Sequence, residues 1–257
     1  MSDELIVERD GAVLRVLFNR PDQRNAMTFA MYEGLTRACE LANADEGIRV
    51  MVLRGAGDEA FVAGTDIGQF RDFADAADGI AYERRITAVT TTLERVRVPT
   101  VAAVSGYCVG GGMVLAACCD IRIATTTARF GVPTARTLGN CLSMNTYSLL
   151  VHHLGPARTL DLLLRARLLT AEDAAGAGFV AEVCAPDELT ARVDALVEQL
   201  SRHAPLTMWA AKEAAYRLRT AALPDGEDIV ATVMGSADFR EGVASFLAKR
   251  RPQWTGR

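Results

Sequence analysis

Residues 105–120 read SGYCVGGGMVLAACCD, and the run of three glycines, Gly110–Gly112, stands directly before an apolar stretch. The segment before it, PTVAAVSG at residues 99–106, is apolar and partly β-branched, which predicts a buried strand. The stretch after the glycines, up to Cys118, is expected to form a helix. A strand that passes through a glycine turn into a helix leaves free backbone N–H groups at the positive end of the helix dipole.

A second junction of the same design occupies residues 61–70, FVAGTDIGQF, where Asp66 and Gln69 have the spacing of a capping box. Phosphate is a common ligand of such helix starts. However, no Lys followed by Ser or Thr comes after the glycines, and their spacing is not GxGxxG, so both phosphate-binding motifs are missing. The alternatives are close packing of helix against strand, or an oxyanion such as a thioester carbonyl becoming an enolate, held by one N–H from each turn. Packing is the simpler explanation for either turn alone, whereas the pair favours a site.

Strands and helices alternate along the first part of the chain, and the last part is mostly helical. Two strands are expected within residues 5–21 around a turn at Asp10–Gly11, and Thr28 is placed to cap a helix over residues 28–45. Further expected elements are a strand in 48–58, a helix over 80–96, two short strands in 120–130, helices from residue 143 onward and a strand near 179–184. This order predicts an α/β core over residues 1–200 and a helical C-terminal region over residues 201–257.

Composition narrows the class of protein. Half of the 257 residues are hydrophobic, and the net charge of −4 comes from interspersed charges, which argues against a nucleic-acid or anionic-membrane surface. The acidic start MSDELIVERD does not resemble a signal peptide, and no stretch has the length of a membrane span. The six cysteines lack CxxC spacing and are interpreted as small buried hydrophobes in a reducing compartment, without disulfides or a bound metal. We therefore expect a cytoplasmic protein.

Several segments together resemble the enoyl-CoA hydratase/isomerase (crotonase) superfamily in order and spacing, over nearly the whole chain. The AGxD and GGG motifs at this separation are the most specific part of the resemblance. It implies a spiral of ββα units followed by a C-terminal helical region that mediates trimers, often paired into hexamers. The segments are FNRPDQRNAM (18–27), FVAGTDI (61–67), PTVAAVSGYCVGGGMVLAACCDIRIA (99–124), ARFGVP (128–133), LLTAEDAAGAGFVAEV (168–183) and DFREGVASFLAKRRP (238–252).

The resemblance also implies a site for a coenzyme A thioester. The backbone N–H groups of Thr65 and Gly111 would form an oxyanion hole, a role that does not depend on side-chain chemistry. Coenzyme A would arrive as part of the substrate, with no separate cofactor and no metal. The implied coenzyme A contacts, for which solvated or purely structural roles are the alternatives, are Arg24, Ala26, Ala63, Asp66, Ile67 and Lys249.

Both carboxylates expected from this family for hydration are replaced. Where the hydratases carry one glutamate two residues after the glycines and another after the proline of FGxPE, this chain has Val114 and Thr134. Valine cannot transfer a proton, and a threonine hydroxyl is too weak a base to activate water. A positioned acid or base contributes about 10²–10⁴-fold to such a step. We therefore doubt ordinary hydratase activity.

Other polar groups follow in the segment TLGNCLSMNTYSLL, residues 137–150. Cys141 is a candidate nucleophile or base, but no histidine is near it in sequence, and a buried inert thiol is favoured. Asn145 and Tyr147 could hydrogen-bond a substrate or simply pack on a helix face, and Ser143 could cap that helix. The resemblance implies that the helix holding Tyr82, Glu83 and Arg84 covers the acyl pocket. Glu83 is the only nearby carboxylate that could swing into that pocket, although a solvated position is favoured for it. We expect Asp120 to hold a strand end, and His152 and His153 to be structural.

Two classes of function remain open. The first is a lyase or isomerase of fatty acid metabolism that stabilises an enolate or another oxyanion in the hole and uses non-standard proton chemistry. The second is a catalytically inactive protein of the same fold that binds acyl-CoA, which the loss of both acids favours. Either would have an acyl-CoA ligand and form a homotrimer or hexamer, with no nucleic acid or membrane as partner. The acyl group is not determined by the sequence.

Overall fold

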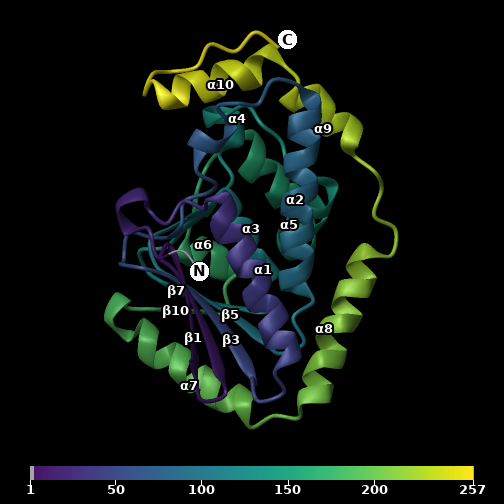
Figure 1. Ribbon diagram of the computed structural model, residues 1–257. Helices are drawn as coiled ribbons and strands as arrows, with labels where there is room; N and C mark the ends of the chain where they lie inside the picture. The colour runs from purple at the N-terminus through teal and green to yellow at the C-terminus, as the bar shows by residue number, and fades with distance from the viewer. Residues whose placement is uncertain (1–2, 257) are drawn as a thin grey trace.

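The computed structural model describes residues 3–256 and shows an α/β fold with two sheets (Figure 1). The larger sheet is mixed, because β1 pairs antiparallel with β2 and all its other pairs are parallel. Its strands, in spatial order, are β1 (Leu5–Asp10), β2 (Val13–Phe18), β3 (Val50–Gly55), β5 (Thr100–Val104), β7 (Ile121–Thr125) and β10 (Glu182–Cys184). The smaller sheet contains β4 (Ala60–Val62), β6 (Tyr107–Val109), β8 (Arg129–Gly131) and β9 (Leu169–Thr170).

Alternating side chains of the larger sheet supply two separate cores. In β3, Met51 and Leu53 belong to the main core, whereas Val50 and Val52 belong to a smaller core under helix α7. Figure 1 shows α7 along the lower edge of the sheet, with α1, α2, α3 and α5 gathered on its other side. Within the described residues the helices are α1 (Phe29–Ala44), α2 (Ala76–Glu94), α3 (Gly111–Cys118), α4 (Thr134–Thr137), α5 (Met144–Leu164), α6 (Ala171–Gly176), α7 (Leu189–Ser201), α8 (Pro205–Thr220), α9 (Glu227–Met234) and α10 (Ala237–Leu247), together with three 3₁₀ turns, Pro21–Gln23, Ile67–Phe70 (η2) and Pro186–Glu188.

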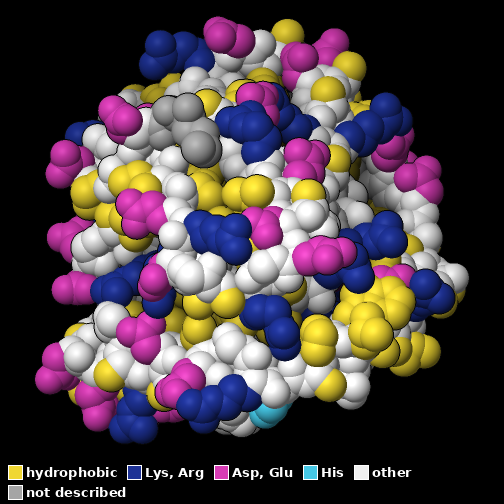
Figure 2. Space-filling view, turned by 60° about the horizontal axis from the view of Figure 1, so that its bottom comes forward, with side chains coloured by type: hydrophobic (Ala, Val, Ile, Leu, Met, Phe, Trp, Pro, Cys, Tyr) yellow, Lys and Arg dark blue, Asp and Glu magenta, His cyan; other side chains and the backbone are white. Residues whose placement is uncertain are grey.

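The C-terminal helices contact the body in two different ways. Helices α9 and α10 form a third core that joins η2 and α2 through residues such as Phe70, Met234 and Phe239. Helix α8 has no buried residue along its length and lies along one side of the molecule (Figure 1). Hydrophobic side chains gather on that side in Figure 2, and Leu206 and Leu218 of α8 are 68% and 79% exposed.

Two basic side chains of α8 reach into the body and hold the helix there. Lys212 Nζ pairs with the Asp120 carboxylate and donates to the Val98 carbonyl at 2.8 Å. Arg219 forms a two-point ion pair with Glu94 of α2, with both Nη2–O distances at 2.7 Å, and donates to Asn145 Oδ1 of α5. Polar anchors at both sites therefore add to the limited apolar packing of α8, in which Met208 contacts the core under α7.

Most of the sequence-based expectations for the fold are confirmed. The hairpin turns at Asp10–Gly11, Thr28 caps α1 by accepting a hydrogen bond from the Met31 N–H, and the α/β class is correct. The short strand β9 was not predicted, because its two residues carry no periodic pattern. The division at residue 200 stays a prediction, although α8 begins close after it.

Two local predictions were wrong. Asp66 caps the short turn η2, but Gln69 does not complete a capping box, because its side-chain oxygen accepts a hydrogen bond from Phe29 N at the start of α1. The helix expected over residues 80–96 begins earlier, at Ala76, where Asp75 and Asp78 form a capping box of their own. For Gln69, the hydrogen bond from Phe29 N therefore takes the place of the local capping-box bond.

Because the ion pair between Arg219 and Glu94 is buried, two substitutions in α8 should lower the free energy of unfolding by very different amounts. Arg219→Met removes the partner of a carboxylate that is 9% exposed and should lower the free energy of unfolding by about 3 kcal/mol. The matched control is Arg217→Met, which breaks a pair whose arginine is 72% exposed and should cost less than about 1 kcal/mol. Urea titrations of both variants measure the two losses, and equal losses would contradict this account.

Candidate active site

The two glycine turns singled out from the sequence lie against each other. Gly64 follows β4 with φ +92°, and Gly110 follows β6 with φ +56°, a backbone region that favours glycine. A Cβ on Gly110 would stand 3.4 Å from Gly64 Cα, and one on Gly64 would stand 4.0 Å from Gly111 N. The strand ends of the smaller sheet therefore bring Thr65 and Gly111 together.

Close packing explains one glycine of the run. A Cβ on Gly112 would come within 2.0 Å of the Val62 carbonyl oxygen, so α3 starts in direct backbone contact with β4. A Cβ on Gly111 would instead meet side-chain oxygens, at 2.8 Å from Tyr32 Oη and 3.6 Å from Thr65 Oγ1. Packing and a polar site are thus both present, at neighbouring residues.

The Thr65 and Gly111 amides have no hydrogen-bond acceptor among the described residues. The chain on either side of Thr65 is fixed, because Met27 N–H donates to the Gly64 carbonyl and Asp66 N–H donates to the Met27 carbonyl. Neither the Thr65 N–H nor the Gly111 N–H donates a hydrogen bond to any residue in the range 3–256. Gly111 is also the first residue of α3, where the helix dipole is positive. Both amides are therefore free to donate to a negatively charged oxygen.

The opposite end of α3 is fixed by a buried arginine. Arg122 donates to the carbonyl oxygens of Ala116, at 3.0 Å, and of Cys119, both in the last turn of the helix or just beyond it. It also donates to the Phe179 carbonyl and lies over the Phe179 ring. Burial lowers the pKa of Arg122 from its ordinary value. A cation at this end complements the negative pole of the dipole.

A chain of three hydroxyl groups borders the free amides. Thr65 Oγ1 lies 2.8 Å from Tyr32 Oη of α1 and 2.8 Å from Tyr82 Oη of α2. Burial raises the pKa of Tyr32 to about 12 and also raises the pKa of Tyr82, so both phenols stay neutral near pH 7. The Tyr82 ring packs against the rings of Phe70 and Phe73. Neither hydroxyl contact was predicted from the sequence, because the three residues come from three separate segments.

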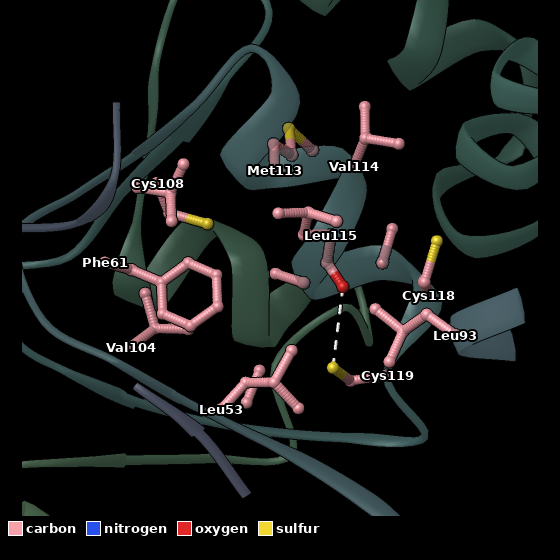
Figure 3. Packing of buried hydrophobic residues seen from close by; sticks show 14 of the residues in the cluster. Leu53, Phe61, Leu93, Val104, Cys108, Met113, Val114, Leu115, Cys118 and Cys119 are labelled. Carbon is pink, nitrogen blue, oxygen red and sulfur yellow. Dashed lines mark hydrogen bonds between the residues drawn. The ribbon is translucent and has the colours of Figure 1, made fainter. Parts of the chain in front are cut away.

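Apolar and weakly polar side chains occupy the two positions at which the resemblance expects glutamates. Val114 on α3 is 3% exposed, and Figure 3 shows it pointing away from the side of the cluster that holds Leu115, Phe61 and Leu53. Thr134 is the first residue of α4, and its carbonyl accepts hydrogen bonds from Leu138 N and Gly139 N. Neither side chain can exchange a proton at neutral pH.

Most polar groups in the loop before α5 and in its first turn make hydrogen bonds within the protein. Ser143 caps α5, as expected, by accepting a hydrogen bond from Thr146 N. Burial raises the pKa of the Cys141 thiol to about 12, which agrees with an inert buried group. Asn145 binds Arg219, and the half-buried Tyr147 hydroxyl accepts a long hydrogen bond of 3.5 Å from Leu142 N.

Glu83 is buried, so the solvated position that the sequence favoured is wrong. Its side chain points inward from α2 and is 5% exposed, and Oε2 accepts a hydrogen bond from Ser143 N at 2.9 Å. Burial raises the pKa of this carboxyl to about 7, and the Ser143 hydrogen bond acts in the opposite direction. The solvated neighbour is Arg84, which pairs with Glu227. The charge pattern of α2 alone could not show which of two adjacent residues faces inward.

Glu83 also lines a pocket of about 250 Å³ between α2, the start of α5 and the segment leading into α9. Its wall includes apolar and neutral polar groups such as Ile80, Thr87, Asn145 and Val230, together with the charged residues Arg84, Asp225 and Glu227. The Glu83 side chain therefore borders an open space in addition to the Ser143 amide.

The residues implied for coenzyme A contact divide into two groups. Arg24 is exposed with φ +49°, lies over the Tyr107 ring and is 3.6 Å from Glu59, and Lys249 is exposed at the end of α10. The half-buried group, Ala26, Ala63, Asp66 and Ile67, lies beside the glycine turn at Gly64. The Ala63 N–H donates to the Arg24 carbonyl, and Ile67 is the first residue of η2. Arg20 donates to the Ala26 carbonyl and pairs with Asp66.

Several other sequence-based assignments can be placed. Asp120 holds the start of β5, because its Oδ2 accepts from Thr100 N at 2.7 Å, and it also binds Lys212. The structural role of His153 is confirmed by its 2.9 Å contact with the Ala117 carbonyl, and burial lowers its pKa to about 4. In the range 3–256 no cluster of three His, Cys, Asp or Glu residues could hold a metal ion, and no helix is long and apolar enough to cross a membrane.

Comparison with known proteins gives consistent matches. The family model described as enoyl-CoA hydratase/isomerase matches residues 8–257. The probable enoyl-CoA hydratase echA8 of Mycobacterium tuberculosis is 33% identical, with 99% of each chain covered. The 2,3-dehydroadipyl-CoA hydratase of Escherichia coli is also 33% identical, again over 99% of each chain. A crystal structure of an enoyl-CoA hydratase/carnithine racemase from Magnetospirillum magneticum matches with a TM-score of 0.82 and 35% identity, covering 100% of this chain and 97% of that one.

The buried carboxyl of Glu83 makes stability depend on pH. Its pKa of about 7 lies above the ordinary value of 4.5, so the folded state holds this proton more tightly than the unfolded state does. Its stabilising contribution is present below about pH 4.5 and is lost as pH rises through about 7. Relative to Glu83→Gln, the wild-type free energy of unfolding should fall by about 2–3 kcal/mol between about pH 5 and 8.

Urea titrations across this pH range provide the measurement. Glutamine keeps an oxygen acceptor for Ser143 N but does not titrate. Glu227→Gln changes an exposed carboxylate at the same pocket and should leave the pH dependence as in the wild type. Parallel pH curves for the wild type and Glu83→Gln would contradict the assignment.

Proposed function

Because the chain belongs to the enoyl-CoA hydratase/isomerase family, we propose that it binds an acyl-CoA with the thioester carbonyl between the Thr65 and Gly111 amides. The observation that carries this proposal is the pair of N–H groups that donate to no residue in the range 3–256, brought together by two glycine turns and bordered by the buried side chains of Tyr32 and Thr65. Hydrogen bonds to a developing oxyanion are strong in such a site, because water does not compete for them.

The reaction supported best is one that passes through a thioester enolate or a related oxyanion. Removing a proton or a carboxylate group from the carbon next to the carbonyl moves negative charge onto the carbonyl oxygen, and the two amides would stabilise that charge. Each such donor contributes about 10²–10³-fold in enzymes that use one. The Tyr32 and Tyr82 hydroxyls, which are neutral near pH 7, add polarity at the same place without adding charge.

Hydration is supported less well than enolate chemistry, although the names of the similar proteins from Mycobacterium tuberculosis and Escherichia coli contain the word hydratase. Addition of water to a double bond needs one group to activate the water and another to deliver a proton to carbon. The side chains of Val114 and Thr134 supply neither. The same observation favours the second candidate function, an inactive acyl-CoA binding protein.

The proposal also includes the coenzyme A contacts and the oligomer. Arg24 and Lys249 are exposed cations suited to the phosphates of coenzyme A, and Ala26, Ala63, Asp66 and Ile67 lie near the first glycine turn, where the pantetheine would pass. A homotrimer or hexamer would cover the apolar side chains on α8. Cytoplasmic location stays a prediction.

A CoA thioester should bind and the matching free acid should not, because only the thioester reaches both the proposed coenzyme A contacts and the free amides. Butyryl-CoA and butyrate can be compared by isothermal titration calorimetry. Gly111→Ala places a methyl group 2.8 Å from Tyr32 Oη and should weaken butyryl-CoA binding at least about 10-fold. The matched control is Gly176→Ala in α6, where an added Cβ meets nothing within 4 Å. No butyryl-CoA binding to the wild type at millimolar concentration would remove the proposed function.

Crotonyl-CoA hydration by the wild type should be very slow or absent, because Val114 and Thr134 cannot perform the two proton-transfer roles. Loss of absorbance of the conjugated thioester measures the rate, with binding measured in parallel on the same sample. A turnover number near the enzyme median of about 10 s⁻¹ would show that other residues supply those roles. Turnover of another acyl-CoA in a panel would favour the enzyme over the inactive binding protein.

A further inference from the structure

The two oxygens of the Glu83 carboxyl have different surroundings. Oε2 accepts the 2.9 Å hydrogen bond from Ser143 N, at the N-terminus of α5, where the helix dipole also favours negative charge. Oε1 has no hydrogen-bond partner among residues 3–256, and the side chain lines the 250 Å³ pocket. One oxygen is therefore anchored and the other is available to a ligand in the pocket.

The pocket and the candidate oxyanion hole both adjoin α2, through Glu83 and through Tyr82. Tyr82, the residue before Glu83, bonds to Thr65 Oγ1 and so fixes this turn of the helix against the candidate oxyanion hole. The charge of Glu83 also acts on Tyr32, whose hydroxyl lies 2.8 Å from the position of a Gly111 Cβ. The Glu83 carboxyl is therefore close enough to the candidate oxyanion hole for its charge to act on a hydroxyl that borders it.

The other acids at this pocket are less suited to proton exchange. Glu227 binds the exposed Arg84 through two short hydrogen bonds, at 2.5 and 2.7 Å, and Asp225 accepts from the Gly226 and Glu227 amides. Cys141 is held protonated by burial. Glu83 is thus the one carboxyl of this pocket, among the described residues, that is both buried and open to a ligand on one side.

We propose that Glu83 is the catalytic residue that exchanges a proton with the α-carbon of the bound acyl thioester, in place of acids at positions 114 and 134. The proposal rests on the function proposed above. Oε1 removes the proton, the electron pair of the C–H bond forms the enolate C=C bond, and the carbonyl π electrons move onto the oxygen held by Thr65 and Gly111. The reverse transfer returns the proton from Glu83 to carbon, and no further reactant is needed.

The ionisation of Glu83 suits this role. Burial brings its pKa to about 7, so both protonation states are well populated at neutral pH, which is the condition for an efficient base. Exchange should therefore increase as pH rises through about 7 and then level off. The titratable or charged groups that face Glu83 or line its pocket are Tyr32, Tyr82, Arg84, Cys141, Tyr147, Asp225 and Glu227.

The test follows deuterium incorporation at the α-carbon of butyryl-CoA in D₂O by proton NMR, with butyryl-CoA binding measured on the same protein. Glu83→Gln should bind butyryl-CoA within about threefold of the wild type but exchange at least about 100-fold more slowly. Glu227→Gln is the matched control at the same pocket and should keep wild-type exchange. Glu83→Asp keeps a carboxyl on a shorter side chain and should retain part of the rate.

The outcomes separate the two proposals. No butyryl-CoA binding to the wild type would overturn the proposed function and this inference with it. Binding without exchange in the wild type, or exchange in Glu83→Gln close to the wild-type rate, would overturn the role of Glu83 and leave acyl-CoA binding intact. If Glu83→Gln does not fold, the wild-type pH profile decides, and a profile that stays flat between about pH 5 and 9 would overturn the inference.

Discussion

The approach of two backbone segments, the ends of β4 and β6, is the constraint on which the rest of the site depends. Gly112 touches the Val62 carbonyl so closely that any side chain there would force the two elements apart. This contact fixes the start of α3 relative to β4 and, one residue earlier, sets the Gly111 amide beside Thr65. Arg122 then fixes the other end of α3 through its carbonyl oxygens. The helix is held at both ends, so its first amides keep their direction without any bound ligand.

The features that could be predicted from the sequence are those encoded locally. The glycine turns, the Thr28 cap and the α/β order each depend on a few neighbouring residues, and the pairing of Thr65 with Gly111 was implied by the resemblance to the family. Residues whose environment is set by distant segments could not be predicted. Glu83 meets Ser143 across 60 positions of sequence, and Gln69 meets Phe29 across 40. In α2, Ile86, Val89 and Leu93 mark the inward face at helical spacing, and Glu83 lies on that face three residues before Ile86, but the pattern does not show which distant segment packs there.

The surroundings of the site also explain why one carboxyl is better tolerated than two. A charged group loses hydration on burial, and two carboxylates in one apolar pocket raise the pKa of each other. Val114 belongs to the packed core, and its replacement by an acid would require that core to accept a charge. Glu83 instead lies at the start of α5, where an amide and a helix dipole already compensate part of its desolvation. An acid on α2 can therefore be buried without placing a charge in the core that contains Val114 of α3.

The six cysteines have a consequence for a protein whose family handles thioesters. A free thiolate attacks an acyl thioester and takes over the acyl group, a side reaction called transthioesterification. Here all six thiols are buried, and burial raises the pKa of each, including Cys141 beside the pocket and Cys108, Cys118 and Cys119 around α3. Their thiolate fraction at neutral pH is accordingly very small. Self-acylation by an activated thioester is therefore disfavoured at all six thiols.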